Sequence, residues 1–204
     1  MIGKYRILRK IGKGRYGLVK LAQHVDTQQL VAIKIVNKSL LNIVEKNSIR
    51  TEAEVMSHLS HPNVVQLYEV IETPSELCIV MEYCGGGDLF AYVTKKRRLK
   101  EKRARRIFLQ VLAGLKYCHR HYIVHRDIKA ENIFLDELKR KVTIGDWGFS
   151  SEFHPGSKIE TACGSLDYAA PEVLSGSSAS VGSHVDVWSL GKYHSCFYYH
   201  KSFN

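Results

Sequence analysis

One short segment, residues 125–132, constrains the fold and the chemistry of this chain more than any other. It carries a carboxylate at Asp127, an ammonium at Lys129 and an amide at Asn132, at fixed offsets. A second carboxylate, Asp146, follows further along the chain and is succeeded by Trp147 and Gly148. A carboxylate that can accept a proton, together with two side chains that can ligate a metal ion, predicts machinery for transferring a phosphoryl group.

The composition sets the class of protein. The chain has 204 residues, of which 45% are hydrophobic, and this predicts a globular protein with one core or two small lobes. No apolar run reaches the ~20 residues of a membrane-spanning helix, and residues 1–5 lack the apolar core of a secretory signal. We therefore expect the cytoplasm or the nucleus as the location, and no membrane partner. Five cysteines without paired spacing predict thiols rather than disulfides or a metal site.

The secondary-structure pattern changes after residue 83. Before it, strands are predicted at residues 5–10, 17–23, 30–36, 64–71 and 77–81, and one helix at residues 49–59. The helix is expected to stop before Pro62, because proline disfavours helical geometry in the preceding residue. After the glycines at 85–87 the pattern becomes helical, over residues 89–95 and 103–121. This shift predicts a hinge in an α+β chain.

A basic run at residues 95–106 holds much of the formal net charge of +10. It leads into Ile107, Val111 and Leu115, which follow helical spacing, so the later charges are predicted to lie on the solvated face of an amphipathic helix. A nuclear-localisation signal or a patch for an acidic partner is the alternative. No interleaved aromatic residues offer a stacking platform, so the run gives no clear indication of nucleic-acid binding.

Three further motifs surround the segment at 125–132. Residues 12–17 are rich in glycine, and small residues let the backbone of a hairpin approach phosphate oxygens closely, although such hairpins are also common as purely structural turns. Lys34 lies on the otherwise apolar strand 31–34, where a buried ammonium needs a partner. Residues 161–172 form the third motif, downstream of Asp146.

In this order, the motifs resemble the signature segments of protein kinases. Residues 161–172 resemble the activation segment of kinases related to AMP-activated protein kinase, including the microtubule affinity-regulating group. The resemblance covers roughly residues 5–191. It implies a bilobal, protein-kinase-like α+β fold, with an antiparallel β small lobe over residues 1–83 and a mostly helical, incomplete large lobe over residues 84–191.

The resemblance implies a site for ATP. Lys34 is expected to hold the α and β phosphates and to pair with a helix glutamate. Of the two candidates, Glu52 and Glu54, Glu52 has the offset from residues 61–63 that related kinases have. The residues expected to contact the nucleotide are Ile11, Gly12, Lys13, Gly14, Arg15, Tyr16, Gly17, Val19, Ala32, Lys34, Met81, Glu82, Cys84, Asp88 and Phe134.

The resemblance also implies the catalytic roles. Asp127 is expected to accept or orient the proton of the substrate hydroxyl, and Lys129 to steady the transferring phosphate. Asn132 and Asp146 are expected to hold magnesium ions. Ser165 is expected to bridge Asp127 and Lys129. A lysine two residues after the base is typical of serine/threonine kinases.

The resemblance implies that phosphorylation of Thr161 switches the activity on. Phosphorylation by an upstream activating kinase would add about −1.5 to −2 charges, which Arg126 is placed to pair with. The alternative interpretation of Thr161 is an ordinary surface threonine.

The chain is expected to end in an atypical tail, because residues 192–204 show neither the family resemblance nor a helical period. The large lobe is then truncated, and the helix around Val111 and Leu115 is expected to lose part of its cover. The expected function is transfer of phosphate from ATP, with Mg2+, to serine or threonine of protein substrates. The alternative is a noncatalytic kinase-like protein that binds a nucleotide or a partner, or acts as a decoy for upstream kinases.

Overall fold

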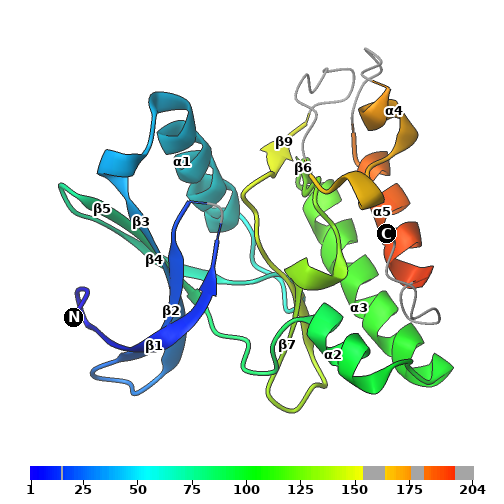
Figure 1. Cartoon of the computed structure of the whole chain (residues 1–204), viewed down its shortest axis with the longest axis horizontal. Coiled ribbons are helices and arrows are strands. Elements are labelled where there is room, and N and C mark those ends of the chain that lie inside the picture. Colours follow the sequence, from blue (N-terminus) through cyan, green and yellow to red (C-terminus); the bar gives the residue numbers. More distant parts are fainter. Residues whose placement is uncertain (15, 154–163, 176–181, 196–204) are drawn as a thin grey trace. The chain divides into compact units, whose positions relative to one another are not determined.

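The computed structural model of this chain describes residues 1–14, 16–153, 164–175 and 182–195 (Figure 1). The chain divides into two compact units. The first consists of Met1–Ser60 and Val65–Tyr83, and the second of His61–Val64 and the chain from Cys84 onward.

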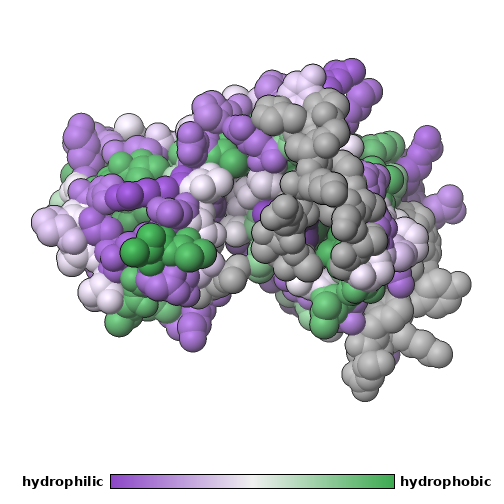
Figure 2. Space-filling view, turned by 90° about the horizontal axis from the view of Figure 1, so that it is seen from above, coloured by the Kyte–Doolittle hydropathy of each residue, from purple (hydrophilic) through white to green (hydrophobic). Residues whose placement is uncertain are grey.

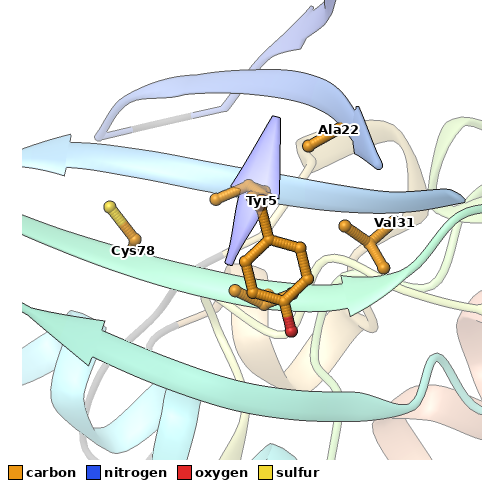
Figure 3. Packing of buried hydrophobic residues seen from close by; sticks show 6 residues of the cluster. Tyr5, Ala22, Val31 and Cys78 are labelled. Atoms are coloured by element: carbon orange, nitrogen blue, oxygen red, sulfur yellow. The ribbon is translucent and has the colours of Figure 1, made fainter. Parts of the chain in front are cut away.

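The first unit is built on one antiparallel sheet with the strand order β1-β2-β3-β5-β4. Its strands are β1 (Tyr5–Lys13), β2 (Leu18–His24), β3 (Leu30–Asn37), β4 (Leu67–Glu72) and β5 (Glu76–Glu82). Side chains alternate between the two faces of a strand, so Val31 and Ile33 share one face with Cys78 and Val80 of β5. These residues, with Ala22 and the ring of Tyr5, form a buried core (Figure 3).

The helix of the first unit, α1 (Ile43–Ser57), begins earlier than the predicted residue 49. A capping box sets this start, because the Asn42 side chain accepts from the Glu45 N–H at 2.9 Å and the Glu45 carboxylate accepts from the Asn42 N–H at 3.0 Å. Ile43 and Val44 are both 76% exposed, so the first turn has no buried stripe to reveal it in the sequence. On the face that Figure 2 shows, hydrophobic residues lie among hydrophilic ones.

The second unit is mostly helical. Its helices are α2 (Leu89–Lys96), α3 (Glu101–Arg120), α4 (Pro171–Leu174) and α5 (His184–Ser195), with short 3-10 turns η2 (Ala130–Asn132) and η3 (Leu166–Tyr168). Two small antiparallel pairs join β6 (Ile123–Val124) to β9 (Ser151–Glu152), and β7 (Ile133–Leu135) to β8 (Val142–Ile144). A further 3-10 turn, η1 (Lys38–Leu40), belongs to the first unit.

The two faces of α3 differ in their cover. Val111 and Leu115 are 0% and 2% exposed, whereas Leu109 and Leu112 of the same helix are 49% and 39% exposed. The α5 helix continues past Gly191 to Ser195, although the residues from 192 onward show no helical period in the sequence. Buried side chains on α5, including Tyr193, compensate for that weak pattern.

Strand β4 begins at Leu67, three residues after the predicted start at Val64. Val64, with the rest of His61–Val64, belongs to the second unit instead. The Asn63 side chain donates to the Val142 carbonyl at 2.7 Å, and the Asn63 carbonyl accepts from the Ile144 N–H at 2.9 Å. Val64 forms an isolated parallel bridge with Ile144. An alternating apolar pattern cannot reveal that its first residues pair with a distant strand.

Two general expectations can be compared with the described residues. No helix described here is long and apolar enough to cross a membrane. Among the described cysteines, Cys78, Cys84 and Cys118 form no disulfide. Burial, together with the nearby charge of Asp186, raises the pKa of Cys118 to about 12, so this thiol stays protonated. Cys163 and Cys196 lie outside the described residues.

We expect Asn42→Ala to lower the free energy of unfolding by about 1 kcal/mol, because it leaves an N–H at the start of α1 without its acceptor. The measurement is urea unfolding followed by circular dichroism. Asn47→Ala is the control, since Asn47 is exposed inside the same helix. Alanine there is expected to leave the stability unchanged or raise it by about 0.5 kcal/mol. Equal losses in the two variants would contradict the role of the capping box.

Candidate active site

A buried ion pair joins β3 to α1 inside the first unit. The Lys34 ammonium donates to both carboxylate oxygens of Glu52, at 2.6 and 2.7 Å, and the two residues are 5% and 3% exposed. Val31 and Ile33 face the sheet core, so Lys34 projects from the opposite face of the strand. Glu54 is exposed. The choice of Glu52 over Glu54 as the partner is therefore confirmed.

The glycine-rich stretch forms the turn between β1 and β2. The Gly14 N–H donates to the Gly17 carbonyl at 2.8 Å. A Cβ atom on Gly17 would lie 2.1 Å from the carbonyl oxygen of Ile35, so no other residue fits there. A Cβ on Gly14 would lie 3.4 Å from Cε of Lys34, which places the turn beside the lysine side chain. Arg15 lies outside the described residues.

The other predicted nucleotide contacts of the first unit lie on the sheet. Val19 is opposite Lys34 in the β2–β3 register, and Ala32 is opposite Met81 in the β3–β5 register. Glu82 ends β5. The contacts expected on and just after β1 are Ile11, Gly12, Lys13, Gly14 and Tyr16.

Three predicted nucleotide contacts, Cys84, Asp88 and Phe134, belong to the second unit. Asp88 and Phe134 form an isolated antiparallel bridge, so these two are neighbours. The Asp88 carboxylate also accepts from the Ala91 N–H at 2.7 Å and caps α2. That hydrogen bond gives Asp88 a structural role that the sequence did not predict.

Asp127 lies at the centre of a dense hydrogen-bond cluster and is 3% exposed. Its Oδ1 accepts from the Ser165 N–H at 3.0 Å and from the Ser165 hydroxyl at 2.9 Å. Its Oδ2 accepts from the Asn132 amide and lies near the Lys129 ammonium, each at 2.9 Å. Lys129 also donates to the Ser165 hydroxyl at 2.7 Å. The predicted bridge of Ser165 between Asp127 and Lys129 is confirmed.

The charge state of Asp127 follows from this cluster. Burial alone raises the pKa of a carboxyl, but the hydrogen bonds and charge of Lys129, with the hydrogen bonds of Ser165 and Asn132, hold the pKa of Asp127 below its usual range. Asp127 is therefore ionised at neutral pH. A buried carboxylate with fixed orientation can hold and align a hydroxyl that approaches it.

The two expected metal ligands have the chemistry that Mg2+ requires. The Asn132 amide nitrogen donates to Asp127, and among the described residues nothing donates to the Asn132 side-chain oxygen. Asp146 is exposed, and its carboxylate has no described partner. The Gly145 N–H donates to the Asn132 carbonyl at 2.9 Å, which brings the residue before Asp146 beside Asn132. Two oxygen ligands suit Mg2+, which keeps several waters.

The other possible metal ligands among the described residues are His, Cys, Asp and Glu side chains. Within the described ranges of the chain, no three His, Cys, Asp or Glu side chains gather closely enough to hold a metal ion. The oxygen ligands of Asn132 and Asp146 therefore fit Mg2+ better than a metal that needs nitrogen or sulfur.

Sequence reasoning gave no role to Asp186, which is 0% exposed on α5. Its carboxylate accepts from the backbone N–H groups of His125 at 2.9 Å and Arg126 at 2.8 Å, and lies 2.8 Å from Nε2 of His119. These contacts hold the segment before Asp127, where Arg126 has a φ of 65°. The signal in the sequence is an acidic residue between Val185 and Val187, since a buried charge needs partners.

His125 connects the two predicted catalytic segments. Its ring is 0% exposed; Nε2 donates to the Gly145 carbonyl at 3.0 Å, and Nδ1 accepts from the Asp127 N–H at 3.2 Å. A carbonyl can only accept, so in this arrangement Nε2 carries the ring proton and Nδ1 is the acceptor. The Trp147 ring packs edge-on against it, with centroids 4.7 Å apart.

The predicted switch cannot be located here, because Thr161 lies outside the described residues. Its expected partner, Arg126, donates from Nε to the Phe149 carbonyl at 2.6 Å. Gly164 follows the segment with a φ of 97°, and a Cβ there would lie 2.3 Å from the Arg126 carbonyl oxygen. Gly164 therefore lies beside the backbone of Arg126.

Comparison with known proteins gives a family match over nearly the whole chain. The protein kinase domain family matches residues 5–202, which extends beyond Gly191. Similar curated proteins include the serine/threonine protein kinase OSK3 of rice, from both the indica and the japonica subspecies. Each is 46% identical over 188 residues, covering 92% of this chain and 37% of the relative. The chain thus spans little more than a third of the length of these relatives. The expected protein-kinase-like α+β fold is confirmed.

We expect Gly17→Ala to lower the free energy of unfolding by about 2 kcal/mol, because the new Cβ meets a backbone oxygen that cannot move aside. Thermal and urea unfolding measure the loss. Gly12→Ala is the control in the same hairpin, since its Cβ would meet its nearest neighbour, Val19 Cβ, at 3.7 Å. That variant is expected to match the parent or gain up to about 1 kcal/mol. A Gly17→Ala protein as stable as the parent would contradict the close approach.

Asp186→Asn tests the carboxylate that holds the catalytic segment. Burial raises the pKa of Asp186, but the hydrogen bonds and charge of His119 and the contacts with His125 outweigh burial and lower that pKa below its usual value. A lowered pKa in the folded state stabilises the protein above the pKa of the unfolded state, and this stability is lost as the pH falls through the folded value. At pH 7 we expect the variant to lose about 3 kcal/mol, because an amide offers only one acceptor to the two N–H groups.

The pH dependence separates this role from simple loss of packing. Between about pH 5 and about pH 3 the parent is expected to lose stability, and the loss in Asp186→Asn is expected to be smaller. Urea unfolding at several pH values gives both quantities. Asp26→Asn, at an exposed position, is the control and is expected to follow the parent. The same pH slope in Asp186→Asn and the parent would show that Asp186 does not contribute in this way.

Proposed function

This chain belongs to the protein kinase domain family, and from that premise we propose that it transfers the γ-phosphate of ATP to serine or threonine of protein substrates. The observation that carries the proposal is the cluster around Asp127. There a buried carboxylate is held ionised by Lys129, Ser165 and Asn132. Such a group is suited to aligning a hydroxyl for attack on phosphorus.

The residues predicted to bind the nucleotide have distinct roles in this proposal. Lys34, fixed by Glu52, holds the α and β phosphates, and the small residues of the glycine-rich turn let its backbone approach phosphate oxygens closely. Asn132 and Asp146 hold Mg2+ through their side-chain oxygens. Bound ATP supplies the phosphoryl group, and bound Mg2+ neutralises the charge that develops on it.

The chain's own residues then manage the proton and the charge. Asp127 aligns the substrate hydroxyl and takes its proton as the new oxygen–phosphorus bond forms and the bond to ADP breaks. Lys129 lies 2.9 Å from Asp127, where its ammonium can balance negative charge on the transferring group. Asp186 acts through the backbone, since its hydrogen bonds fix the residues just before Asp127.

The class and regulation of the kinase are part of the proposal. Lys129, two residues after Asp127, supports serine and threonine as acceptors, and so does the similarity to rice OSK3. The motif at residues 161–172 supports a place among kinases related to AMP-activated protein kinase. An upstream kinase that phosphorylates Thr161 would then switch this chain on, with Arg126 as a partner of the phosphate.

We expect the purified chain to transfer labelled phosphate from ATP to a serine- or threonine-containing protein, and Asp146→Asn to reduce the rate by about a hundredfold or more. The amide keeps one oxygen but removes the negative charge with which Asp146 would bind Mg2+. Asp26→Asn, at an exposed position, is the matched control and is expected to keep the parent's rate. Nucleotide binding without any transfer by the parent would support the noncatalytic alternative instead.

A further inference from the structure

The basic run carries a concentrated charge that nothing described in this chain compensates. Every Lys and Arg of residues 95–106 except Arg103 is exposed. The run holds nine of the 30 Lys and Arg and a single Glu, so its formal charge of +8 approaches the +10 of the whole chain. None of these cations takes part in the ion pairs of the described residues. Clustered like charges repel one another, so an anionic partner would stabilise the surface.

The turn between β7 and β8 extends this surface. The Arg103 guanidinium donates to the Lys139 carbonyl, and the Gln110 side chain donates to the Arg140 carbonyl at 3.2 Å. These contacts fix the turn beside the first turns of α3 and place the exposed Arg140 next to it. We call the exposed Lys and Arg of residues 95–106, together with Arg140, the basic surface.

One cation of the basic surface is held at a conformational cost. Arg97 follows α2 with a φ of 64° and a ψ of −37°. A positive φ in this position favours glycine, and a larger residue there costs about 1 kcal/mol. The chain therefore carries a positive charge where an uncharged glycine would fit the backbone better.

The basic surface continues into an apolar stripe along α3. Lys102, Arg105, Leu109 and Leu112 follow each other at intervals of three and four residues, so they lie on one face of the helix. Leu109 and Leu112 are 49% and 39% exposed, whereas the other face of the helix is buried in the second unit. The exposed face thus changes from basic to apolar along the helix axis.

We propose that this face of α3 and the basic surface dock an acidic segment of another protein. Its carboxylates would meet the cations, and apolar residues further along the segment would cover Leu109 and Leu112. The order of charge and apolarity along the helix supports a peptide, because a peptide can present both chemistries in sequence. This docking surface is independent of the proposed transfer activity.

Two other polyanions fit the surface less well. Residues 95–112 and 136–141, all of which the structure describes, expose no aromatic side chain, and their one aromatic residue, Phe108, is half-buried. Single-stranded nucleic acids stack their bases on aromatic side chains. Proteins at a membrane interface use Trp and Tyr as anchors. Within these ranges the surface therefore lacks the aromatic groups with which single-stranded nucleic acids and membranes are normally bound.

The test uses the intact chain and a fluorescein-labelled peptide in which a run of glutamates is followed by two leucines one helical turn apart. Fluorescence anisotropy is expected to show saturable binding that weakens as salt is added. Lys102→Glu combined with Arg105→Glu is expected to raise Kd by about tenfold or more. Leu109→Ala combined with Leu112→Ala is expected to raise Kd by about threefold to tenfold.

Lys4→Glu combined with Lys46→Glu is the matched control, since it reverses two exposed charges in the first unit. It is expected to change Kd by less than about twofold. Equal weakening in the control and the α3 charge variant would overturn the proposal, because only net charge would then matter. Tighter binding of duplex DNA or phosphatidylserine vesicles than of the peptide at the same salt would also overturn it. Thermal melting of each variant verifies that it is folded.

Discussion

The buried carboxylate of Asp186 is the interaction on which the catalytic segment depends. It is the only described acceptor for the N–H groups of His125 and Arg126, and it holds Arg126 at a positive φ. Without it, two buried donors would lose their partner at a cost of about 1–3 kcal/mol each. Because His125 and Arg126 directly precede Asp127, their fixed backbone determines where the Asp127 carboxylate points. The later contacts with Lys129, Ser165 and Asn132 build on that placement.

The buried charges of this chain and the cations of the basic surface differ in whether they have a partner. Lys34 is buried against Glu52, and Asp127 is buried against Lys129, so each of these charges has a partner at hydrogen-bond distance. Burial makes such pairs sensitive to the loss of one member, because the remaining charge stays out of water. The cations of the basic surface have no such partners among the described residues and remain in water. The first arrangement suits catalysis, and the second suits association with another molecule.

The sequence predicted those features that depend on local pattern or on the family resemblance. The strands of the first unit, the Lys34–Glu52 pair and the Ser165 bridge are of this kind. The sequence missed the start of α1, because exposed Ile43 and Val44 hide a helix that its capping box defines. It also misplaced Val64 and gave Asp186 no role. Both form contacts with residues far along the chain, and no local period records such contacts.

The most direct test of a magnesium- and ATP-dependent site is the heat of ATP binding to the intact chain, measured in matched titrations with Mg2+ and with a chelator. Among the described residues nothing donates to the side-chain oxygens of Asn132 and Asp146, so we expect these oxygens to bind Mg2+ and Mg2+ to tighten the binding of ATP. Lys34→Met is expected to weaken binding in both titrations, because it removes the cation that the phosphates would meet. ATP binding that is equally tight with and without Mg2+, or absent from both titrations, would contradict the account.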